Sequence, residues 1–322
     1  MRDLDLTSLR LFVSVCETRN IARAGELANI VGSAISKRLA QLEETLGTPL
    51  LLRRRHGVDP TPAGETLLEH ARSMLASSQR IERDMAAFAS GVKGQVRVLA
   101  TVSVLAESLA EDVAAFLQQP AHADIRVDME EQVSANVARG IRQGSASLGI
   151  CWASEHGADL SGLQTRPYRF DQLAIVVHPS HPLAQRKSVT FEQTLGYEHV
   201  SLPVASAVQV MLLRMAAALG KALQQRVIVS NFEAALRVVQ ARLAISVVPQ
   251  EVARFYAASH DLKIITLAEP WAKRQFAICF KDEATLPAAA KLLLAHLEAC
   301  GAPAAERQGG RAAELAVWVD QN

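Results

Sequence analysis

The side chains best suited to chemistry lie near the start of the chain, in residues 20–43. Apolar residues recur there at helical spacing, are interrupted at residues 30–32, and recur again from Ala34 to Leu42. This pattern predicts a helix, a short turn and a second helix. The outward face of the second helix carries Ser33, Ser36, Lys37, Arg38 and Gln41. Hydroxyl and cationic groups on one helix face suit contacts with phosphates and base edges in a DNA major groove. An ordinary pair of amphipathic surface helices is the alternative.

The densest positive cluster of the chain follows this helix pair, at Arg53, Arg54 and Arg55. Short apolar runs at residues 49–52 and 58–61 predict two strands, with the arginines in the turn between them. Such a cluster neutralises DNA phosphates and releases counterions, which gives affinity without sequence preference. With a further amphipathic helix at residues 6–15, the pattern predicts a winged helix-turn-helix. A solvated turn would also account for the arginines alone.

Length and composition bound the protein class. The 322 residues, of which 49% are hydrophobic, suffice for two or three domains with large cores. No apolar run is long enough to cross a bilayer and the N-terminus lacks a signal-peptide core, so we expect a cytoplasmic protein without a membrane partner. The net charge is only +1, and the four cysteines have no C-x-x-C spacing. They indicate neither a disulfide framework nor a zinc site.

A long helix is predicted after Gly64. Its apolar and small residues recur at alternating gaps of four and three, the heptad seam of a coiled coil. The seam consists of Leu67, Ala71, Met74, Ser78, Ile81, Met85 and Phe88. A narrow seam of this kind needs a partner helix, so we expect dimerisation; packing against the second half of the same chain is the alternative.

Strands and helices alternate in the remainder of the chain, which predicts βαβ units and parallel sheets. Expected strands are residues 95–101, 125–130, 146–152, 168–177, 226–230, 245–248 and 275–280, and expected helices are residues 104–118, 135–142, 208–219, 233–241 and 287–300. Two Rossmann-like lobes, with crossings near residues 163–167 and 267–270, would account for this order.

Ligands of such sheets bind at the carboxyl ends of strands and at helix N-termini. The side chains expected at those positions are Thr101, Ser103, Ser134, Cys151, Trp152, Ser206, Asn231 and Phe232. They would form a cleft of hydroxyls, an amide and two aromatic rings, which suits a small carboxylate with a planar or partly apolar body. For each serine taken alone, the alternative is a helix cap.

Catalytic and metal-binding motifs are not indicated. The sequence has no G-x-S-x-G motif, and the Gly220-Lys221 pair lacks both the first glycine and the hydroxyl residue of a phosphate-binding loop. His178 and His181 are three residues apart, but a proline follows each of them and interrupts a helical metal-binding face. We therefore predict no catalytic residues, no metal and no cofactor.

The N-terminal motifs resemble the signature of LysR-type transcriptional regulators over about sixty residues. They are Phe12, residues 24–27, Ala34-x-Ser36-Lys37, Leu42-Glu43-Glu44-x-Leu46-Gly47-x-Pro49-Leu50, Arg53 and Thr61-Pro62-Ala63-Gly64. The resemblance implies that residues 33–46 are the recognition helix and residues 53–57 the wing, and it adds Thr61 to the DNA-contacting set. Where the family commonly has Ser-Gln, this chain has Val31-Gly32, which can neither cap the helix through a side chain nor bond a base edge.

The second half also resembles that family, whose effector domain is similar to type 2 periplasmic-binding proteins. Residues 144–150 match a family motif with Ser147 at the usual aspartate, and residues 244–249 match another with Arg242 and Ala244 at usual glycines. The resemblance implies a homotetramer, a dimer of dimers, on a pseudo-palindromic double-stranded DNA operator. A small-molecule effector would modulate the activity of this regulator.

The expected organisation is a DNA-binding domain at residues 1–62, a dimerising linker helix at residues 63–90, and an effector-binding domain at residues 91–301. Lobe I would comprise residues 95–163 and 268–301, and lobe II residues 164–267. Residues 302–322 would be a flexible tail or carry a short helix at residues 312–319. Two other protein classes remain open at this point. One is an α/β binding protein or enzyme whose N-terminal helices only dimerise, and the other is an architectural DNA binder without an effector.

Overall fold

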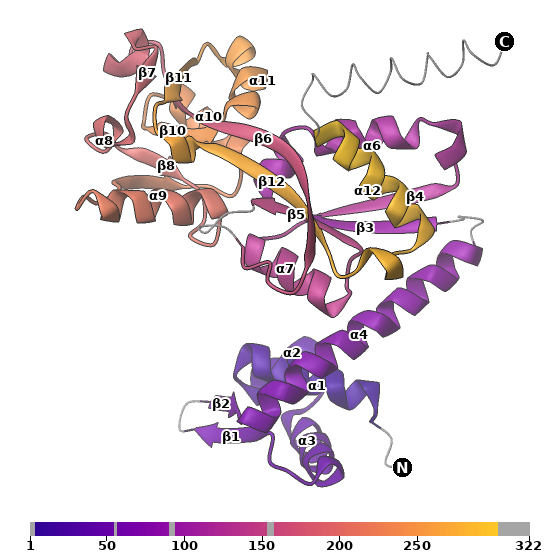
Figure 1. The fold of residues 1–322 in the computed structure, drawn as a ribbon. Helices are drawn as coiled ribbons and strands as arrows, with labels where there is room; N and C mark the ends of the chain where they lie inside the picture. The colour runs from indigo at the N-terminus through magenta and orange to yellow at the C-terminus, as the bar shows by residue number, and fades with distance from the viewer. Residues whose placement is uncertain (1–3, 55–56, 90–93, 153–157, 302–322) are drawn as a thin grey trace, which may run out of the picture. The chain divides into compact units, whose positions relative to one another are not determined.

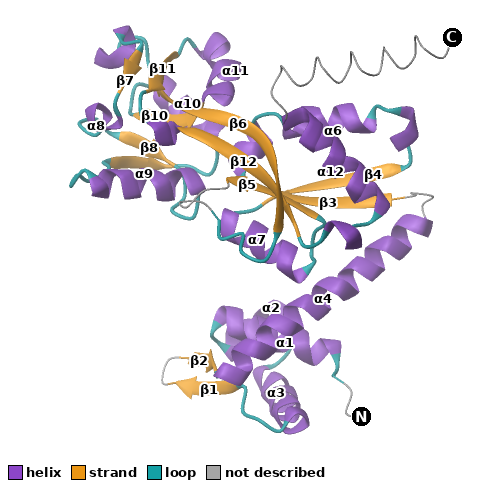
Figure 2. Cartoon of the chain, viewed as in Figure 1, coloured by secondary structure: helices purple, strands orange, loops and turns teal. Residues whose placement is uncertain are grey.

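The computed structural model describes residues 4–54, 57–89, 94–152 and 158–301. The chain forms two compact units, mainly residues 1–90 and residues 91–322, which Figure 1 draws in chain order and Figure 2 by secondary structure. None of the described helices is both long and apolar enough to cross a membrane. The expected tail at residues 302–322 lies outside the described residues.

The N-terminal unit is a winged helix-turn-helix, as the sequence predicts. Its elements are α1 (Leu6–Thr18), α2 (Ile21–Ala28), α3 (Gly32–Leu46), β1 (Leu51–Arg54), β2 (Gly57–Pro60) and α4 (Pro62–Ala89). The helices share one core, in which Phe12 of α1 and Ile35 of α3 are fully buried. Strands β1 and β2 pair antiparallel as the wing.

Two contacts hold the wing against the helices. The Glu43 carboxylate of α3 accepts hydrogen bonds from the backbone N–H groups of Leu50 and Leu51, at 2.7 and 3.1 Å. Gly64 lets α4 approach β1, because a Cβ at this position would collide with the Leu50 carbonyl oxygen. Two of the motifs that carry the family resemblance therefore position the wing relative to α3.

The C-terminal unit contains two α/β lobes. The strands of lobe I lie in the order β4 (Ile125–Glu131), β3 (Gly94–Ala100), β5 (Leu148–Trp152), β12 (Lys273–Phe280) and β6 (Gln164–Val177). The first three are parallel, and β12 is antiparallel to β5 and to β6. The helices of lobe I are α5 (Val102–Ala106), α6 (Leu109–Leu117), α7 (Ser134–Gln143) and α12 (Ala288–Gly301).

Lobe II is built on the second half of β6. On one side of β6 lie β10 (Ile245–Pro249), β8 (His199–Ser201) and β9 (Gln225–Ile228), and on the other lie β11 (Lys263–Leu267) and β7 (Ser188–Val189). Its helices are α8 (Phe191–Thr194), α9 (Ala207–Ala218), α10 (Phe232–Gln240) and α11 (Gln250–His260). The sequence did not anticipate α8, α11, β7, β8 and β11.

The continuous strand β6 belongs to both lobes. It pairs with β12 as far as Gln172 and with β10 and β11 from Leu173 onward. The change of partners therefore lies later in the chain than the crossing expected near residues 163–167.

A buried ion pair lies next to the point where β6 changes its partner strands. Asp171 of β6 and Arg274 of β12 form an ion pair that is almost completely buried. The expected helix at residues 104–118 is broken into α5 and α6 at Glu107, whose carboxyl group interacts electrostatically with Asp171. Burial and the Asp171 carboxylate raise the pKa of Glu107 to about 8. Glu107 is therefore protonated at neutral pH.

Candidate DNA-binding surface and effector cleft

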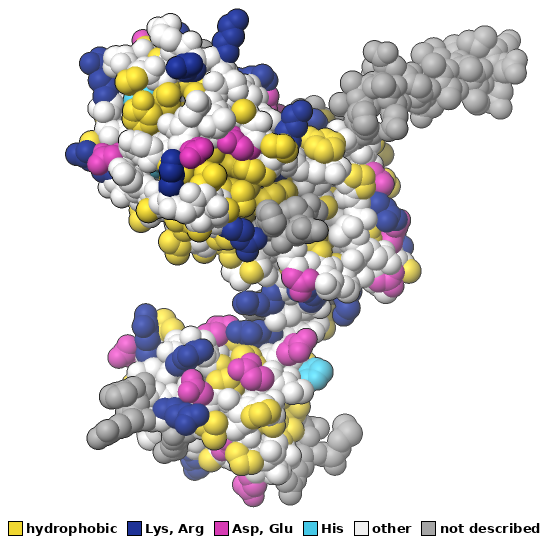
Figure 3. Space-filling model, turned by 60° about the vertical axis from the view of Figure 1, so that its left-hand side comes forward, with side chains coloured by type: hydrophobic (Ala, Val, Ile, Leu, Met, Phe, Trp, Pro, Cys, Tyr) yellow, Lys and Arg dark blue, Asp and Glu magenta, His cyan; other side chains and the backbone are white. Residues whose placement is uncertain are grey.

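The outward face of α3 carries the polar residues that the sequence assigns to DNA. The apolar side of the helix is buried, whereas Ser33, Lys37, Arg38 and Gln41 are exposed and Ser36 is half-buried. Figure 3 shows Lys and Arg side chains interspersed with acidic ones on the N-terminal unit. Val31 occupies the N-cap position of α3 and makes no side-chain hydrogen bond, because the valine side chain has no acceptor atom.

Arg38 makes an ion pair within the unit. Its Nη1 atom lies 3.1 Å from Asp5 Oδ2, and both side chains are about half exposed. The Asp5 carboxylate also accepts hydrogen bonds from the backbone N–H groups of Thr7 and Ser8, which lower the pKa of Asp5. Asp5 is therefore ionised at neutral pH and forms a charged pair with Arg38. Among the described residues, Lys37 has no ion-pair partner.

The wing presents at least one of the three predicted arginines. The Arg54 side chain is mostly exposed, and its Nε atom lies 3.5 Å from Asp59. The backbone N–H of Val58 donates to the Arg19 carbonyl at 3.0 Å, which ties the hairpin to the turn between α1 and α2. The side chain of Arg53 and the whole of Arg55 lie outside the described residues.

Thr61, which the resemblance assigns to DNA, has a structural role in the N-terminal unit. Its hydroxyl donates to the Pro49 carbonyl at 2.8 Å and accepts the Gly64 N–H at 2.9 Å. The side chain is buried and caps the start of α4. The hydroxyl proton is engaged within the unit, and the contact of Thr61 with DNA stays a prediction.

The predicted seam of α4 has two parts. At the N-terminal end, Ala71 is fully buried in the core of its own unit, so this turn of the predicted seam packs within the N-terminal unit and not against the second half of the chain. Further along, Met74, Ile81 and Met85 are exposed, while Leu67 and Ser78 are half-buried and the side chain of Phe88 lies outside the described residues. The exposed apolar side chains are available for a partner helix.

A pocket between the two lobes gathers four of the eight predicted effector residues. Thr101 and Ser103 at α5 and Ser134 at α7 line it from lobe I, and Ser206, immediately before α9, lines it from lobe II. The other lining residues are Val102, Glu131, Gln132, Val133, Leu202, Pro203, Ala205, Ala207 and Ser230. Residues separated by a hundred positions in the sequence therefore meet at one site.

Two hydroxyls of this pocket are buried without a hydrogen-bond partner among the described residues. They belong to Ser134 and Ser206. Ser206 holds the N-cap position of α9 but makes no side-chain cap, so the helix-cap alternative does not account for it. A buried hydroxyl without a partner costs free energy. Together with the free backbone N–H groups of the two helix N-termini, these hydroxyls can donate to a ligand oxygen.

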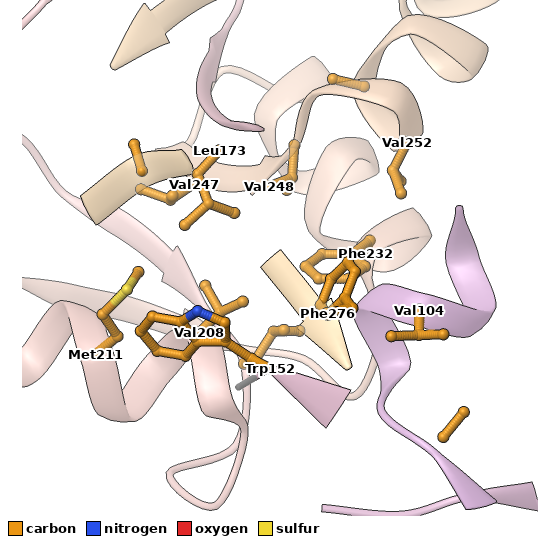
Figure 4. Close-up of a cluster of buried hydrophobic side chains, with 14 of the residues drawn as sticks. Val104, Trp152, Leu173, Val208, Met211, Phe232, Val247, Val248, Val252 and Phe276 are labelled. Atoms are coloured by element: carbon orange, nitrogen blue, oxygen red, sulfur yellow. The ribbon is translucent and has the colours of Figure 1, made fainter. Parts of the chain in front are cut away.

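The other four predicted effector residues do not line this pocket. Asn231 caps α10, because its Oδ1 accepts the Ala234 N–H at 2.9 Å, and it lines a wider neighbouring pocket with Phe232. Cys151 is buried with Cys279 in a separate apolar cluster. Trp152 lies beside Val208 and Met211 of lobe II (Figure 4) and forms part of the main hydrophobic core.

Sequence reasoning missed three polar residues of the pocket. Glu131 is the last residue of β4, Gln132 follows it, and Ser230 follows the end of β9. The same strand-end rule that selected the hydroxyl residues could have found them. The carboxylate of Glu131 matters most, because it places an acceptor beside the donors.

The described residues contain no group of three His, Cys, Asp or Glu side chains that could hold a metal ion. The pocket combines hydroxyl donors, backbone donors and one carboxylate. Such an arrangement can recognise a polar small molecule in a cleft whose walls belong to different lobes.

Two family models match the chain. The model described as "Bacterial regulatory helix-turn-helix protein, lysR family" covers residues 6–65, and the model described as "LysR substrate binding domain" covers residues 89–301. The transcriptional regulator GbpR of Azospirillum brasilense is 26% identical over 298 residues, which are 92% of this chain and 86% of GbpR. The uncharacterized regulator YbhD of Escherichia coli is 25% identical over 296 residues, which are 91% of this chain and 90% of YbhD.

Solved structures share the fold. CbnR, a LysR family transcriptional regulator, has a TM-score of 0.64 at 20% sequence identity, covering 93% of this chain and 100% of CbnR. Full-length CbnR complexed with its target DNA has a TM-score of 0.61 at 22% identity, covering 91% and 99%. The likeness extends over both units of the chain.

Proposed function

This chain belongs to the LysR family of transcriptional regulators, and we propose that it reads a pseudo-palindromic operator through the outward face of α3. As a family member it is a DNA-binding regulator with a small-molecule effector. In our proposal Lys37 and Arg38 contact phosphates, while Ser33, Ser36 and Gln41 face base edges. In the same proposal, the wing arginines contact the adjacent phosphates of the DNA backbone. The exposure of Ser33, Lys37, Arg38 and Gln41 on α3 supports this assignment.

Dimerisation through α4 would place two recognition helices on successive major grooves. The exposed Ile81 and Met85 support a partner helix along this segment, because apolar side chains at heptad spacing are otherwise left in water. We propose a tetramer made of two such dimers as the working assembly.

For the effector, we propose a small carboxylate that also carries hydroxyl or amino donors. The observation that carries this proposal is the pair of buried, unpartnered hydroxyls of Ser134 and Ser206, one from each lobe. A carboxylate oxygen would accept from them, and a hydroxyl or amine of the ligand would donate to Glu131. A ligand held by both lobes favours the closed cleft, and this shift in population would change the spacing of the DNA-binding heads.

The DNA arm is tested by a footprint of the full-length protein on the DNA upstream of its own gene, at two salt concentrations. We expect a pseudo-palindromic protected region that weakens with salt and disappears in the Lys37→Ala/Arg38→Ala variant. A Lys263→Ala variant, which changes an exposed lysine of lobe II, is the control. Protection that survives in the double variant would contradict the assignment of α3.

The effector arm is tested by calorimetric titration with a panel of hydroxy and amino carboxylates and their amides. Ser206→Ala is expected to weaken binding of the active compound, whereas Ser188→Ala, an exposed serine of β7, should leave it unchanged. The same compound should alter the footprint. Equal affinity of the Ser206→Ala variant and the wild type for the compound would show that the effector binds at a different site.

We infer that the protein is not an enzyme and acts in the cytoplasm. Its relatives are transcriptional regulators, which supports this inference over a binding protein or enzyme whose N-terminal helices only dimerise. The effector titration also addresses the architectural alternative, because a DNA binder without an effector would show no ligand-dependent change.

A further inference from the structure

The effector pocket adjoins a larger pocket between the same two lobes, which we call the outer pocket. It shares Val102 and Glu131 with the effector pocket, so the two meet at these side chains. The effector pocket measures about 90 Å³ and the outer pocket about 990 Å³, whereas sites for small molecules usually measure ~300–1,000 Å³. A ligand whose carboxylate lies at Ser206 therefore has most of its body in the outer pocket.

Acidic side chains outnumber basic ones around the outer pocket. The carboxyl groups belong to Glu107, Glu111, Asp112, Glu131, Glu233 and Glu251, and the guanidinium groups to Arg169 and Arg254. Both guanidinium groups are already engaged. Arg169 donates to Asp112 at 2.6 and 2.8 Å, and Arg254 pairs with Glu251. The described lining of the outer pocket therefore offers no uncommitted cation to an anionic ligand group.

Two of the carboxylates remain without an ion-pair partner. Glu233 pairs with Arg237 at 2.8 Å, and Glu107 is the protonated carboxyl group at the break between α5 and α6. Glu111 in the first turn of α6 and Glu131 at the end of β4 are exposed and have no ion-pair partner among the described residues. Each of these two carboxylates is available to one cationic group of a ligand.

The lobe II wall of the outer pocket is aromatic. Phe232 from α10 and both Phe255 and Tyr256 from α11 contribute to it. Phe255 is 79% exposed, and its ring meets that of Tyr256 edge to face, with the ring centroids 5.2 Å apart. The face of an aromatic ring attracts organic cations. Free carboxylates on one wall and an exposed ring on the other suit an ammonium or guanidinium group.

We propose that the effector is an amino acid with a long cationic side chain, which extends across both pockets. This inference rests on the effector site proposed above. The carboxylate accepts from Ser206, whose side chain is 9% exposed and has no hydrogen-bond partner. The α-ammonium group meets Glu131, which lines both pockets. The cationic end of the side chain lies in the outer pocket with Glu111 and Phe255.

The test is calorimetric titration of the full-length protein with L-lysine, L-arginine, L-norleucine and L-2-aminoadipate. Lysine, norleucine and 2-aminoadipate share the same head group and six carbon atoms, and their side chains end in an ammonium, a methyl and a carboxylate group. We expect lysine or arginine to bind at least about fivefold more tightly than norleucine. The aminoadipate should bind more weakly than norleucine, because its second carboxylate faces Glu111.

Two variants report on the outer pocket. Glu111→Gln and Phe255→Leu change exposed side chains, and each should lower the affinity for the cationic amino acid about threefold while the affinity for norleucine stays unchanged. Glu192→Gln removes the same charge from an exposed residue of α8 outside both pockets, and it should bind as the wild type does. Ser206→Ala should weaken the binding of the cationic amino acid and of norleucine alike.

The outcomes separate this inference from the effector site itself. Equal affinity for the cationic amino acids and norleucine, with a loss in Ser206→Ala, would overturn the inference and leave the effector site in place. A cationic preference that depends on Glu111 but not on Ser206 would overturn both. If none of the four amino acids binds, the inference is wrong, and the panel of hydroxy and amino carboxylates decides on the effector site.

Discussion

Replacing Asp5 by asparagine is expected to tighten DNA binding, although Asp5 itself lies outside the proposed DNA-contacting set. Asp5 holds Arg38 through a contact of 3.1 Å in which both side chains are about half exposed. A solvent-exposed ion pair of this kind contributes about 0.2–1 kcal/mol, which corresponds to about a 1.4- to 5-fold gain in affinity once Arg38 is released. Asparagine caps a helix as well as aspartate does, so α1 keeps its N-cap.

The assay is fluorescence anisotropy on the footprinted operator over a series of salt concentrations. If the released Arg38 gains a phosphate, the slope of log affinity against log salt should steepen by about 0.9. The control is a double-mutant cycle, in which Asp5→Asn has no effect in an Arg38→Ala background. Weaker binding by a stably folded Asp5→Asn variant would refute the reasoning, because it would mean that Asp5 positions Arg38 for DNA.

Three further predictions concern stability and assembly. Glu43→Ala leaves two backbone N–H groups of the wing without their acceptor, and it should lower the free energy of unfolding by about 2–4 kcal/mol, measured by urea denaturation against Glu69→Ala on the exposed face of α4. Ile81→Asp should weaken the dimer by at least about tenfold in sedimentation velocity, whereas the same change at the off-seam Ser77 should not. Because the pKa of Glu107 is raised from 4.5 to about 8 in the folded state, its contribution to stability is complete below pH 4.5 and is lost as the pH rises through 8. The Glu107→Gln variant should therefore show a smaller fall in melting temperature between pH 5 and pH 9, and an unchanged fall would contradict the buried position of this carboxyl.

The N-terminal unit could be predicted from the sequence nearly element by element. Its signals are local: helical periodicity sets the buried face of α3, Gly47 ends that helix in a left-handed conformation, and the short spacing to Pro49 sets the wing. Contacts such as Glu43 to Leu50 join residues only a few positions apart. Thr61 is the exception, because its hydroxyl bonds the carbonyl of Pro49, on the other side of the wing hairpin in the sequence.

The alternation of strands and helices likewise predicts two lobes. It does not reveal that β6 serves both sheets or that Glu107 breaks the first helix, since both features depend on partners that are far away in the sequence. Strand-end reasoning selected eight effector residues, and the tertiary structure brings Thr101, Ser103, Ser134 and Ser206 to one pocket.

The adjacent residues Cys151 and Trp152 illustrate why the other predicted effector residues do not reach this pocket. Successive side chains of a strand point to opposite faces, so one enters the cluster around Cys279 and the other packs on α9. The pairing of His178 with Arg242, which are 64 positions apart, was likewise decided only by the packing of β6 and β10. Local patterns determine which elements form, whereas packing between distant elements determines which side chains meet.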